Sequence, residues 1–349
     1  MATVTKSIGT TARDYSTITL WEAALGGAAG GAGNDAVGEC YDDSDFTESV
    51  TVDDSTPDSV VLSVASGERH DGTAKAVGGS GARNLGAYSI NLNNGALTTI
   101  EWMDLDGNGG SVFELLIVNS SQHSFLHVAK NLIVHDKTIN HTSKGIKSQS
   151  TADILNNIVY DIASAHTSND LHAIWANSGL DSRAQRVCNN TLYNTTGNGA
   201  GSGVCYGIHT QDIANHICSN NISMQTTGGS GTVQDYTLGA GAPTNSTAQT
   251  NMDEDGTAPG SDPQASKTVG DQFVSTTGGS EDLHLKSGSD AIDNGTDLTT
   301  SPTGVNIDIN GRDRDVEGDT WDIGAHELVA APGGGVSIPI ARSYYSELV

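Results

Sequence analysis

Basic residues, prolines, cysteines and aromatic residues are all scarce in this sequence. Its 349 residues include 16 Lys and Arg against 42 Asp and Glu, which leaves a formal charge of −26. An excess of negative charge this large argues against binding to the phosphates of nucleic acid and against adhesion to anionic membranes. No apolar run is long enough to span a membrane, and the amino terminus lacks the apolar run of a secretory signal. We therefore expect a protein that is made in the cytoplasm without a signal peptide, with no nucleic acid and no membrane as partner.

The four cysteines are expected to be free thiols. Without an export signal, Cys40, Cys188, Cys205 and Cys218 are predicted to be reduced and packed as small apolar residues. Cys188 and Cys218 fall one step apart on successive repeats of the pattern described next, so a disulfide between these two stays an open alternative.

An asparagine followed by short apolar or β-branched residues recurs four times in the middle of the chain. The four are Asn131, Asn157, Asn190 and Asn221, at spacings of 26, 33 and 31 residues, and in the last three the preceding residue is also Asn. A period of this size that varies by several residues indicates a solenoid, in which loops of unequal length interrupt a repeated unit. Chance repetition in an Asn-rich chain is the alternative.

Each repeat predicts two short strands and no helix. The segments beside the asparagines are β-branched or aromatic and are bounded by Gly, Ser, Thr, Asn and Asp, and a second strand is expected around Gly145, Ala173 and Gly207. Equivalent residues of stacked coils lie about 4.8 Å apart. Asparagine side chains at that spacing can pass hydrogen bonds from coil to coil, whereas a column of carboxylates would repel itself. The sequence therefore predicts an all-β solenoid with an asparagine ladder.

The chain divides into four predicted parts. Residues 1–25 form an N-terminal segment with a short capping helix, because Thr19 and Glu22 have capping-box spacing and Leu20, Trp21 and Leu25 form an apolar stripe. Residues 26–290 form the shaft, residues 291–330 form its terminator, and residues 331–349 form a Gly-rich linker and a docking tail.

The beginning and the end of the chain resemble a known family. The residues concerned at the end are 282–295, 308–312 and 322–327, which read DLHLKSGSDAIDNG, DINGR and DIGAHE. They resemble the ending of right-handed parallel β-helix proteins of the pectin-lyase-like superfamily, in particular those with a choice-of-anchor C-terminal region. Residues 14–18 and the helix after them are similar to the N-terminal cap of the same proteins. The resemblance implies a right-handed parallel β-helix and leaves the chemistry open, since the superfamily contains lyases, hydrolases, adhesins and viral spikes.

A short apolar and aromatic peptide follows a glycine spacer at the C-terminal end. Residues 333–335 are glycine, and the docking tail behind them contains Val336, Ile338, Ile340, Tyr344 and Tyr345. Such a peptide is suited to docking by strand addition or by tyrosine anchors, while folding back onto the shaft is the alternative. It resembles tails on structural proteins of tailed phages, which implies a place on a virus particle or another extracellular surface.

These expectations favour a non-enzymatic virion structural protein, such as a phage decoration, fibre or tail component. Its tail would bind a capsid or tail protein, or a sister chain in a homo-oligomer, and its shaft would bind surface glycans or receptors. A polysaccharide lyase or glycoside hydrolase is the alternative from another class, and a cell-surface adhesin is the third. Because catalysis on this scaffold needs clustered carboxylates beside a base, and the positions around the asparagines show no such cluster, we expect no catalytic residues and no required cofactor.

Two segments are candidates for binding calcium. Residues 104–109 match the first half of an EF-type loop, with Asp104, Asp106 and Asn108 as ligands, but Leu115 stands where a bidentate Glu belongs. Residues 306–311 are followed by Glu317 at the expected place, yet they begin with a neutral Asn. A hydrogen-bonded Asx turn is the alternative for both.

Overall fold

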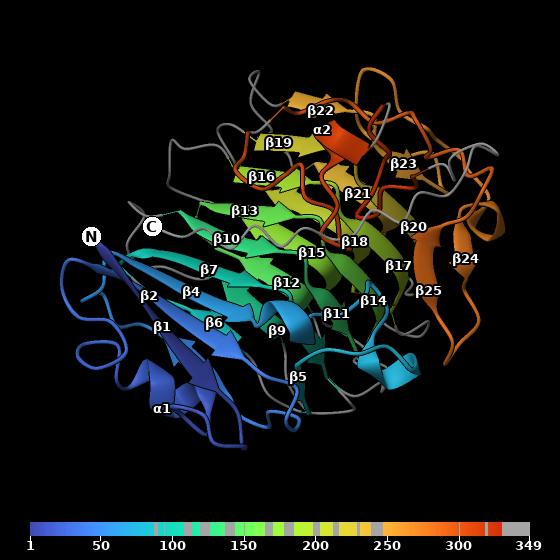
Figure 1. Cartoon of the computed structure of the whole chain (residues 1–349). Coiled ribbons are helices and arrows are strands. Elements are labelled where there is room, and N and C mark those ends of the chain that lie inside the picture. The colour runs from blue at the N-terminus through green and yellow to red at the C-terminus, as the bar shows by residue number, and fades with distance from the viewer. Residues whose placement is uncertain are drawn as a thin grey trace, which may run out of the picture.

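Three parallel β-sheets wind around a common axis to form a solenoid of about six turns (Figure 1). In the computed structural model, the described residues are 1–86, 90–93, 95–107, 114–118, 126–136, 144–149, 151–164, 170–177, 185–197, 203–211, 216–228, 231–238, 247–299, 301–317 and 320–329. The docking tail, with Val336, Ile338, Ile340, Tyr344 and Tyr345, lies outside them.

The three sheets run the length of the solenoid. Sheet A consists of β1 (Ala2–Ile8), β2 (Asn34–Cys40), β4 (Ser59–Val64), β7 (Leu97–Glu101), β10 (His127–Lys130), β13 (Ala152–Leu155), β16 (Gln185–Cys188), β19 (His216–Ser219) and β22 (Thr247–Gln249). Sheet B consists of β5 (Arg83–Leu85), β8 (Asp104–Asp106), β11 (Ile133–His135), β14 (Ile158–Ala163), β17 (Thr191–Thr196), β20 (Ile222–Thr227) and β23 (Met252–Asp253). Sheet C consists of β3 (Val50–Val52), β6 (Ile90–Leu92), β9 (Glu114–Val118), β12 (Lys144–Ser148), β15 (Leu171–Asn177), β18 (Cys205–Gln211) and β21 (Val233–Leu238).

Each regular coil contributes one strand to each sheet, so the repeat has three strands instead of the predicted two. The prediction of an all-β parallel solenoid is confirmed, and the strands expected around Gly145, Ala173 and Gly207 are those of sheet C. The segment around each asparagine contains two strands because the chain turns there from sheet A to sheet B. The residue at this corner has a positive φ, for example 54° at Asn156 and 55° at Asn189, which breaks the strand.

The interior is filled by columns of apolar side chains that repeat from coil to coil. Ala129, Ile154, Val187 and Cys218 align in sheet A, and similar columns in sheets B and C contain Val134, Val159 and Leu192, and Ile146, Ile174 and Ile208. All of these side chains are buried. Stacking one coil on the next therefore removes both faces of each apolar residue from water, which a single coil could not do.

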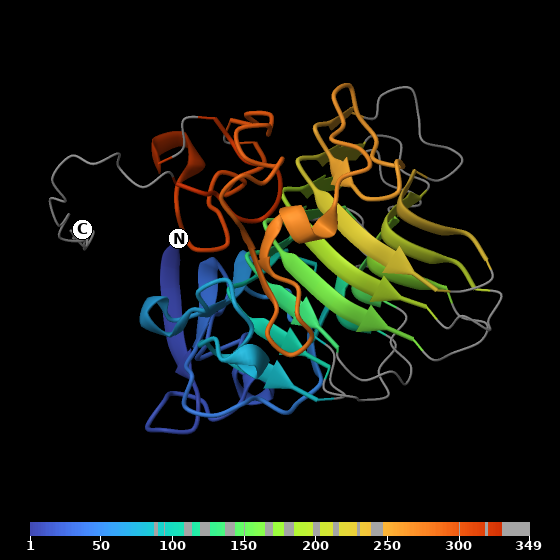
Figure 2. The same cartoon turned by 90° about the vertical axis from the view of Figure 1, so that its right-hand side faces the viewer.

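Sheet B is apolar on its outer face as well. Ile133, Ile158 and Ile222 point away from the solenoid interior and form a second buried cluster with residues of the C-terminal segment, defined as residues 269–329. This segment contains the antiparallel pair β24 (Phe273–Ser275) and β25 (Asp282–Leu285) and the short helix α2 (Arg314–Glu317). Figure 2 shows it in orange and red, lying across the strands. The C-terminal segment thus covers the outer face of sheet B.

The N-terminal helix begins two residues earlier than predicted. Helix α1 (Ile18–Glu22) has Thr17 as its N-cap, whose side chain accepts a hydrogen bond from the backbone nitrogen of Leu20. Glu48 accepts hydrogen bonds from the first two helical nitrogens at 2.8 and 2.9 Å, so a distant carboxylate replaces the predicted capping box. Trp21 is buried, but Leu20 is 52% exposed and does not belong to the apolar stripe. A role for this helix in closing the end of the solenoid stays a prediction.

All four cysteines are free and buried. Cys218 points into the interior column of sheet A, whereas Cys188 belongs to a cluster with Val305 and Trp321 outside that sheet. The disulfide alternative is therefore not observed, because the two thiols lie on opposite faces of the sheet. None of the described helices has the length and the apolar character that crossing a bilayer requires.

Candidate functional site

The predicted asparagine ladder exists, with a different membership. Nδ2 of Asn157 donates to Oδ1 of Asn190 at 2.9 Å, Asn190 donates likewise to Asn221 at 2.9 Å, and Asn221 donates to Asn251 at 3.0 Å. Each amide also donates to a backbone carbonyl of the preceding coil, and each Oδ1 also accepts from the backbone nitrogen of the preceding ladder residue. The ladder thus satisfies buried backbone groups at the corner between sheets A and B.

Asn131 does not belong to this ladder. The register pairs Ile133 with Ile158, which places Asn131 opposite Asn156 and leaves Leu132 in the ladder position. The backbone nitrogen of Leu132 donates to Oδ1 of Asn157, so the ladder ends at that coil. Asn131 was matched to the wrong asparagine because its corner has one asparagine, whereas each of the next three corners has two. The same residue type in two repeats does not show that the two residues are paired in the sheet.

The asparagine at the position before the ladder has another task on each of these coils, because it holds the C-terminal segment. Asn131, Asn156, Asn189 and Asn220 all have a positive φ, and their side chains point outward. Their Nδ2 atoms donate to the backbone carbonyls of Asp308, Gly304, Val305 and Thr296, respectively. The double asparagine therefore combines an inner residue that joins the coils with an outer residue that binds the returning chain.

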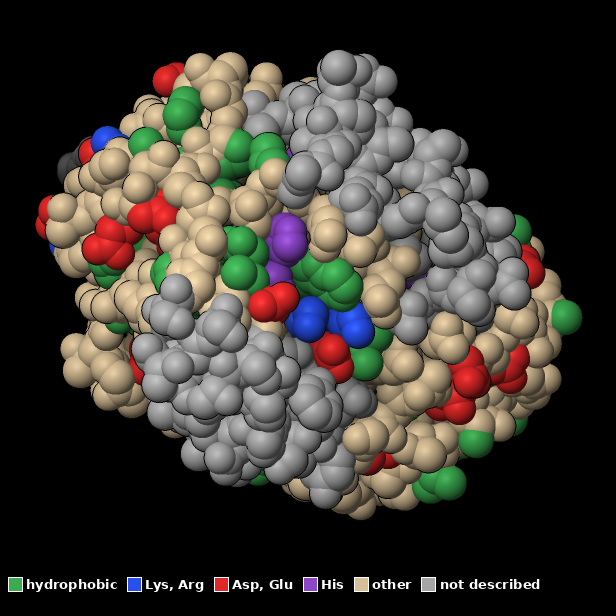
Figure 3. All heavy atoms as spheres, turned by 180° about the vertical axis from the view of Figure 1, so that it is seen from behind, with side chains coloured by type: hydrophobic (Ala, Val, Ile, Leu, Met, Phe, Trp, Pro, Cys, Tyr) green, Lys and Arg blue, Asp and Glu red, His purple; other side chains and the backbone are tan. Residues whose placement is uncertain are grey.

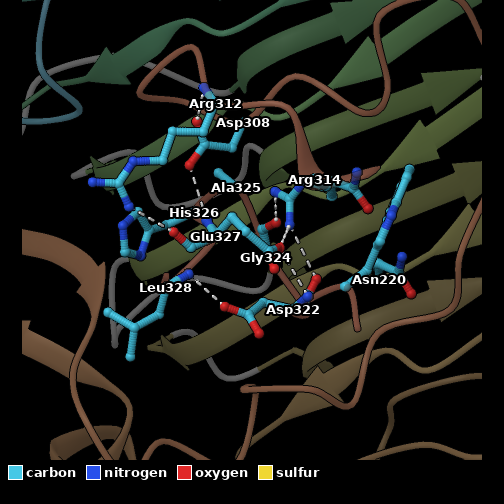
Figure 4. A network of polar contacts seen from close by, with 12 residues as sticks. Asn220, Asp308, Arg312, Arg314, Asp322, Gly324, Ala325, His326, Glu327 and Leu328 are labelled. Atoms are coloured by element: carbon cyan, nitrogen blue, oxygen red, sulfur yellow. Dashed lines mark hydrogen bonds and ion pairs between the residues drawn. The ribbon is translucent and has the colours of Figure 1, made fainter. Parts of the chain in front are cut away.

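The DIGAHE motif forms a buried polar network that anchors the same segment (Figure 4). Nη1 of Arg314 donates to Oε2 of Glu327 at 2.8 Å, and Nη2 donates to the carbonyl of Gly324 at 2.7 Å. Burial raises the pKa of Glu327 to about 7 and that of Asp322 to about 6, while Arg314 lowers both. Arg314 and the two carboxylates are each about 1% exposed. The motif has a structural role here, because its polar atoms bind one another and the backbone.

Two of the three predicted calcium ligands have protein partners. Asp104 and Asp106 are buried on β8. Oδ1 of Asp104 lies 2.9 Å from Nε2 of His135, and Nη1 of Arg83 donates to Asp106 at 3.2 Å. Asn108 lies outside the described residues, and among the residues that are described no group of three or more His, Cys, Asp or Glu side chains could hold a metal ion. A calcium ion at this position stays a prediction.

The second calcium candidate, residues 306–317, contains a hydrogen-bonded turn. The carboxylate of Asp308 accepts hydrogen bonds at 2.7 to 3.0 Å from the backbone nitrogens of Asn310, Arg312 and Glu327. These bonds use both carboxylate oxygens, which is the geometry of the Asx-turn alternative.

A group of basic and aromatic side chains occupies the outer face of sheet C. We call it the sheet C face, and it consists of Glu114, Lys144, Lys147, His172, Trp175, Tyr206 and His209. Strands β12, β15 and β18 align these residues in two columns, Lys147 with Trp175 and His209, and Lys144 with His172 and Tyr206. Figure 3 looks onto this side of the molecule, where histidine, lysine and hydrophobic side chains gather near the centre of the view.

The aromatic rings of the sheet C face are in mutual contact. The rings of His172 and His209 are stacked with centroids 4.9 Å apart, and Tyr206 meets His209 edge-on at 5.0 Å. Nζ of Lys144 lies 5.1 Å from the centroid of Trp175. These contacts fix the orientation of the rings, while Trp175, Tyr206 and His209 remain partly exposed.

The charges of the sheet C face are largely balanced. Nζ of Lys147 lies 3.2 Å from Oε1 of Glu114, and Nζ of Lys144 lies 4.0 Å from the same atom. Burial lowers the pKa of Lys144 and keeps the pKa of His172 well below its usual range. His172 is therefore a neutral imidazole at pH 7, and its buried Nδ1 has no hydrogen-bond partner among the described residues.

A groove on sheet A is the main alternative to the sheet C face as a candidate functional site. It has a volume of about 310 Å³ and is lined by Val128, Asp153, Arg186 and Pro302, among others. Nη2 of Arg186 donates to Asp153 at 2.7 Å, and burial raises the pKa of Asp153 to about 6 although Arg186 lowers it. The acid and the base are thus bound to each other, and this arrangement stabilises the sheet instead of leaving a free catalytic group.

The sheet C face could not be located by counting from the asparagines. Lys147, Trp175 and His209 form one column, yet they follow Asn131, Asn157 and Asn190 by 16, 18 and 19 residues. The loops between sheets B and C differ in length, so a fixed offset mixes the columns. The crowding of histidines between residues 123 and 216 was the available signal, but its described members are spread over all three sheets.

No family model, no curated protein and no solved structure matched this chain.

Proposed function

We propose that this protein is a non-enzymatic β-solenoid that binds a glycan on the sheet C face. The observation that carries the proposal is the alignment of Trp175 on one coil with His209 on the next, beside Tyr206 on the same strand as His209, with partly exposed rings held in place by their neighbours. Adjacent coils lie about 4.8 Å apart. The rings therefore form a platform along the solenoid axis, on which consecutive sugar rings of one chain can stack.

The charge of the face favours a neutral glycan. Glu114 lies beside both lysines and offsets one of their two positive charges, so the face offers hydrogen-bond donors and acceptors with a net charge of about +1. The whole chain carries a formal charge of −26, which repels a polyanion at long range. A neutral polysaccharide is not repelled by this charge. Its hydroxyl groups can form hydrogen bonds with the amine, imidazole and phenol groups of the sheet C face.

A binding screen with single substitutions tests the proposal. The full chain is titrated with neutral and acidic polysaccharides in affinity electrophoresis, and the best ligand is then used with Trp175→Ala and His209→Ala. We expect each substitution to weaken binding about tenfold or more, because aromatic anchors dominate such interfaces. Tyr41→Ala is the matched control, since Tyr41 is a partly exposed tyrosine with Arg13 above its ring at 3.5 Å in the N-terminal coils. Equal binding by Trp175→Ala and Tyr41→Ala would contradict the proposal.

A polysaccharide lyase is the second candidate, and one observation favours it. Burial lowers the pKa of Lys144, and a lysine that loses its proton more readily can act as a base. Incubation with a panel of acidic and neutral polysaccharides, with and without calcium, distinguishes the candidates. New unsaturated or reducing ends that disappear in Lys144→Met would establish the enzyme, whereas binding without new ends supports the non-enzymatic role.

The place on a virus particle and the docking role of the tail rest on the sequence alone. The supporting features are the resemblance of residues 282–327 to β-helix endings and the apolar peptide behind the glycine spacer. Deleting residues 333–349 should leave the solenoid folded and abolish incorporation into the particle or into a homo-oligomer. A truncated protein that still assembles would show that the tail is not the anchor.

A further inference from the structure

A cleft of about 830 Å³ opens between the C-terminal segment and the residues that follow β4 and β7, neighbouring strands of sheet A. Arg69, Asp71 and Trp102 line it from the solenoid, and Asn310, Arg312 and Glu317 line it from the C-terminal segment. Its volume is that of a typical small-ligand site. One wall of the cleft belongs to the C-terminal segment, so the cleft forms only when that segment is packed against the solenoid.

The two arginines in this cleft are exceptional in the molecule. Every other lysine and arginine that the structure describes forms an ion pair with a carboxylate, whereas Arg69 and Arg312 form none with the described residues. The chain has 42 acidic residues for 16 basic ones, so two guanidinium groups in one cleft that form no ion pair with a described carboxylate are not expected by chance. Both groups can donate to an anion that enters the cleft.

Both guanidinium groups are held by neutral contacts. Nε of Arg69 donates to the carbonyl of Val64 at 3.3 Å, and the guanidinium lies 4.5 Å from the centroid of the Trp102 ring. Nη1 of Arg312 donates to the carbonyl of Glu327 at 3.2 Å. These contacts orient the side chains without pairing them with a carboxylate, so the remaining N–H groups can donate to a ligand.

The backbone conformation at Trp102 is unusual for a residue of this size. Trp102 occupies the corner position that Asn131 and Asn156 occupy on the next coils, and its φ is 65°. A left-handed conformation is unfavourable for a bulky residue, and such strain is concentrated at functional sites. His70 supports the ring from 5.8 Å and is itself fixed by a hydrogen bond of 2.8 Å between its Nε2 and the carbonyl of Asn131. The corner thus keeps a tryptophan where asparagine would fit, and the tryptophan holds Arg69.

We propose that this cleft binds a saccharide that carries a carboxylate group. The carboxylate accepts hydrogen bonds from Arg69 and Arg312, whose planar forks match its geometry. The hydroxyl groups of the sugar donate to the carboxylates of Asp71 and Glu317 and to the amide oxygen of Asn310. This site is separate from the sheet C face, so the protein would hold two different glycan groups.

The proposal is tested by ligand-observed NMR on the full chain with sodium glucuronate, glucose, sodium acetate and sodium sulfate. We expect glucuronate to bind and the three other probes to bind more weakly. Arg69→Gln and Arg312→Gln should each weaken glucuronate binding about tenfold or more, since each removes a hydrogen bond to a charged group. Lys286→Gln is the matched control, because it removes one positive charge from an exposed ion pair elsewhere in the C-terminal segment, and it should leave the affinity unchanged.

Several outcomes would overturn the proposal. They are the absence of glucuronate binding, equal affinity in Arg312→Gln and in Lys286→Gln, and binding of acetate or sulfate as tight as that of glucuronate. Arg69→Lys is included as a second variant that preserves the charge beside Trp102 if Arg69→Gln does not fold, and it should bind more weakly than the natural protein. Trp175→Ala separates this proposal from the preceding one: it should weaken binding of the neutral polysaccharide about tenfold or more and leave glucuronate binding intact.

Discussion

Replacing Asn190 by leucine removes the middle of the asparagine ladder with little change in volume. Its Nδ2 donates to the carbonyl of Ile154 and to Oδ1 of Asn221, both at 2.9 Å. Its Oδ1 accepts from the backbone nitrogen and from Nδ2 of Asn157, at 3.1 and 2.9 Å. Its Nδ2 also donates to the carbonyl of Cys188 at 3.1 Å. The substitution therefore breaks five buried hydrogen bonds and leaves the backbone nitrogen of Asn157 without its acceptor.

The expected cost follows from these groups. A buried hydrogen bond contributes about 1 kcal/mol, and a buried donor left without a partner costs about 1–3 kcal/mol. Asn190→Leu should therefore lower the free energy of unfolding by roughly 4 kcal/mol. The matched control is Asn189→Gly, which keeps the positive φ and loses one hydrogen bond, to the carbonyl of Val305, so it should cost about 1 kcal/mol.

Urea denaturation followed by circular dichroism measures both variants. Because a solenoid is stabilised by interfaces between neighbouring coils, the loss in Asn190→Leu should appear in the main transition of the shaft. If Asn190→Leu is no less stable than Asn189→Gly, the ladder is not what holds the coils together, and the reasoning fails.

Two further substitutions test the buried charges. Arg314→Met should lower the free energy of unfolding by about 3–5 kcal/mol, because it leaves Glu327 buried without its cation. The loss should be larger at pH 8 than at pH 5, since burial raises the pKa of Glu327 to about 7 and protonation removes the unpaired charge; equal losses would contradict this. Burial also lowers the pKa of His127 from 6.5 to about 4. As the pH falls through this interval, the unfolded chain binds a proton at His127 before the folded protein does. The free energy of unfolding of the natural protein should therefore fall by up to about 3 kcal/mol. His127→Leu should lack that part of the acid sensitivity, measured by urea midpoints at pH 7 and about pH 4.5, and an unchanged pH dependence would refute it.

The fold was accessible from the sequence because its signal is local and repeated. An asparagine corner flanked by β-branched residues specifies a turn and two short strands wherever it occurs, and stacking multiplies the same signal. The register between coils was harder to predict, because backbone pairing determines it. Asn131 is opposite Asn156, outside the ladder, and not opposite Asn157, although both are asparagines.

The packing of the C-terminal segment could not be predicted from sequence patterns. Nothing in residues 296–308 indicates that their carbonyls bind Asn131, Asn156, Asn189 and Asn220. These contacts join residues more than 70 positions apart, and the donors are side chains that a sequence reading assigns to turns. The cleft beside Trp102 was missed for the same reason, since four of its ten lining residues belong to that segment.

The three sheets differ in which side chains their outer faces leave exposed, and the proposed binding site rests on this difference. Sheet B has an apolar outer face that the C-terminal segment covers, so it contributes stability. Sheet A carries Asp153 and Arg186 bound to each other, with residues 301–303 beside them. Sheet C instead presents partly exposed rings in columns, and that exposure costs hydrophobic stabilisation that burial would supply. In the proposed function, a sugar that stacks on Trp175 and Tyr206 would remove these rings from water and supply the stabilisation that their exposure forgoes.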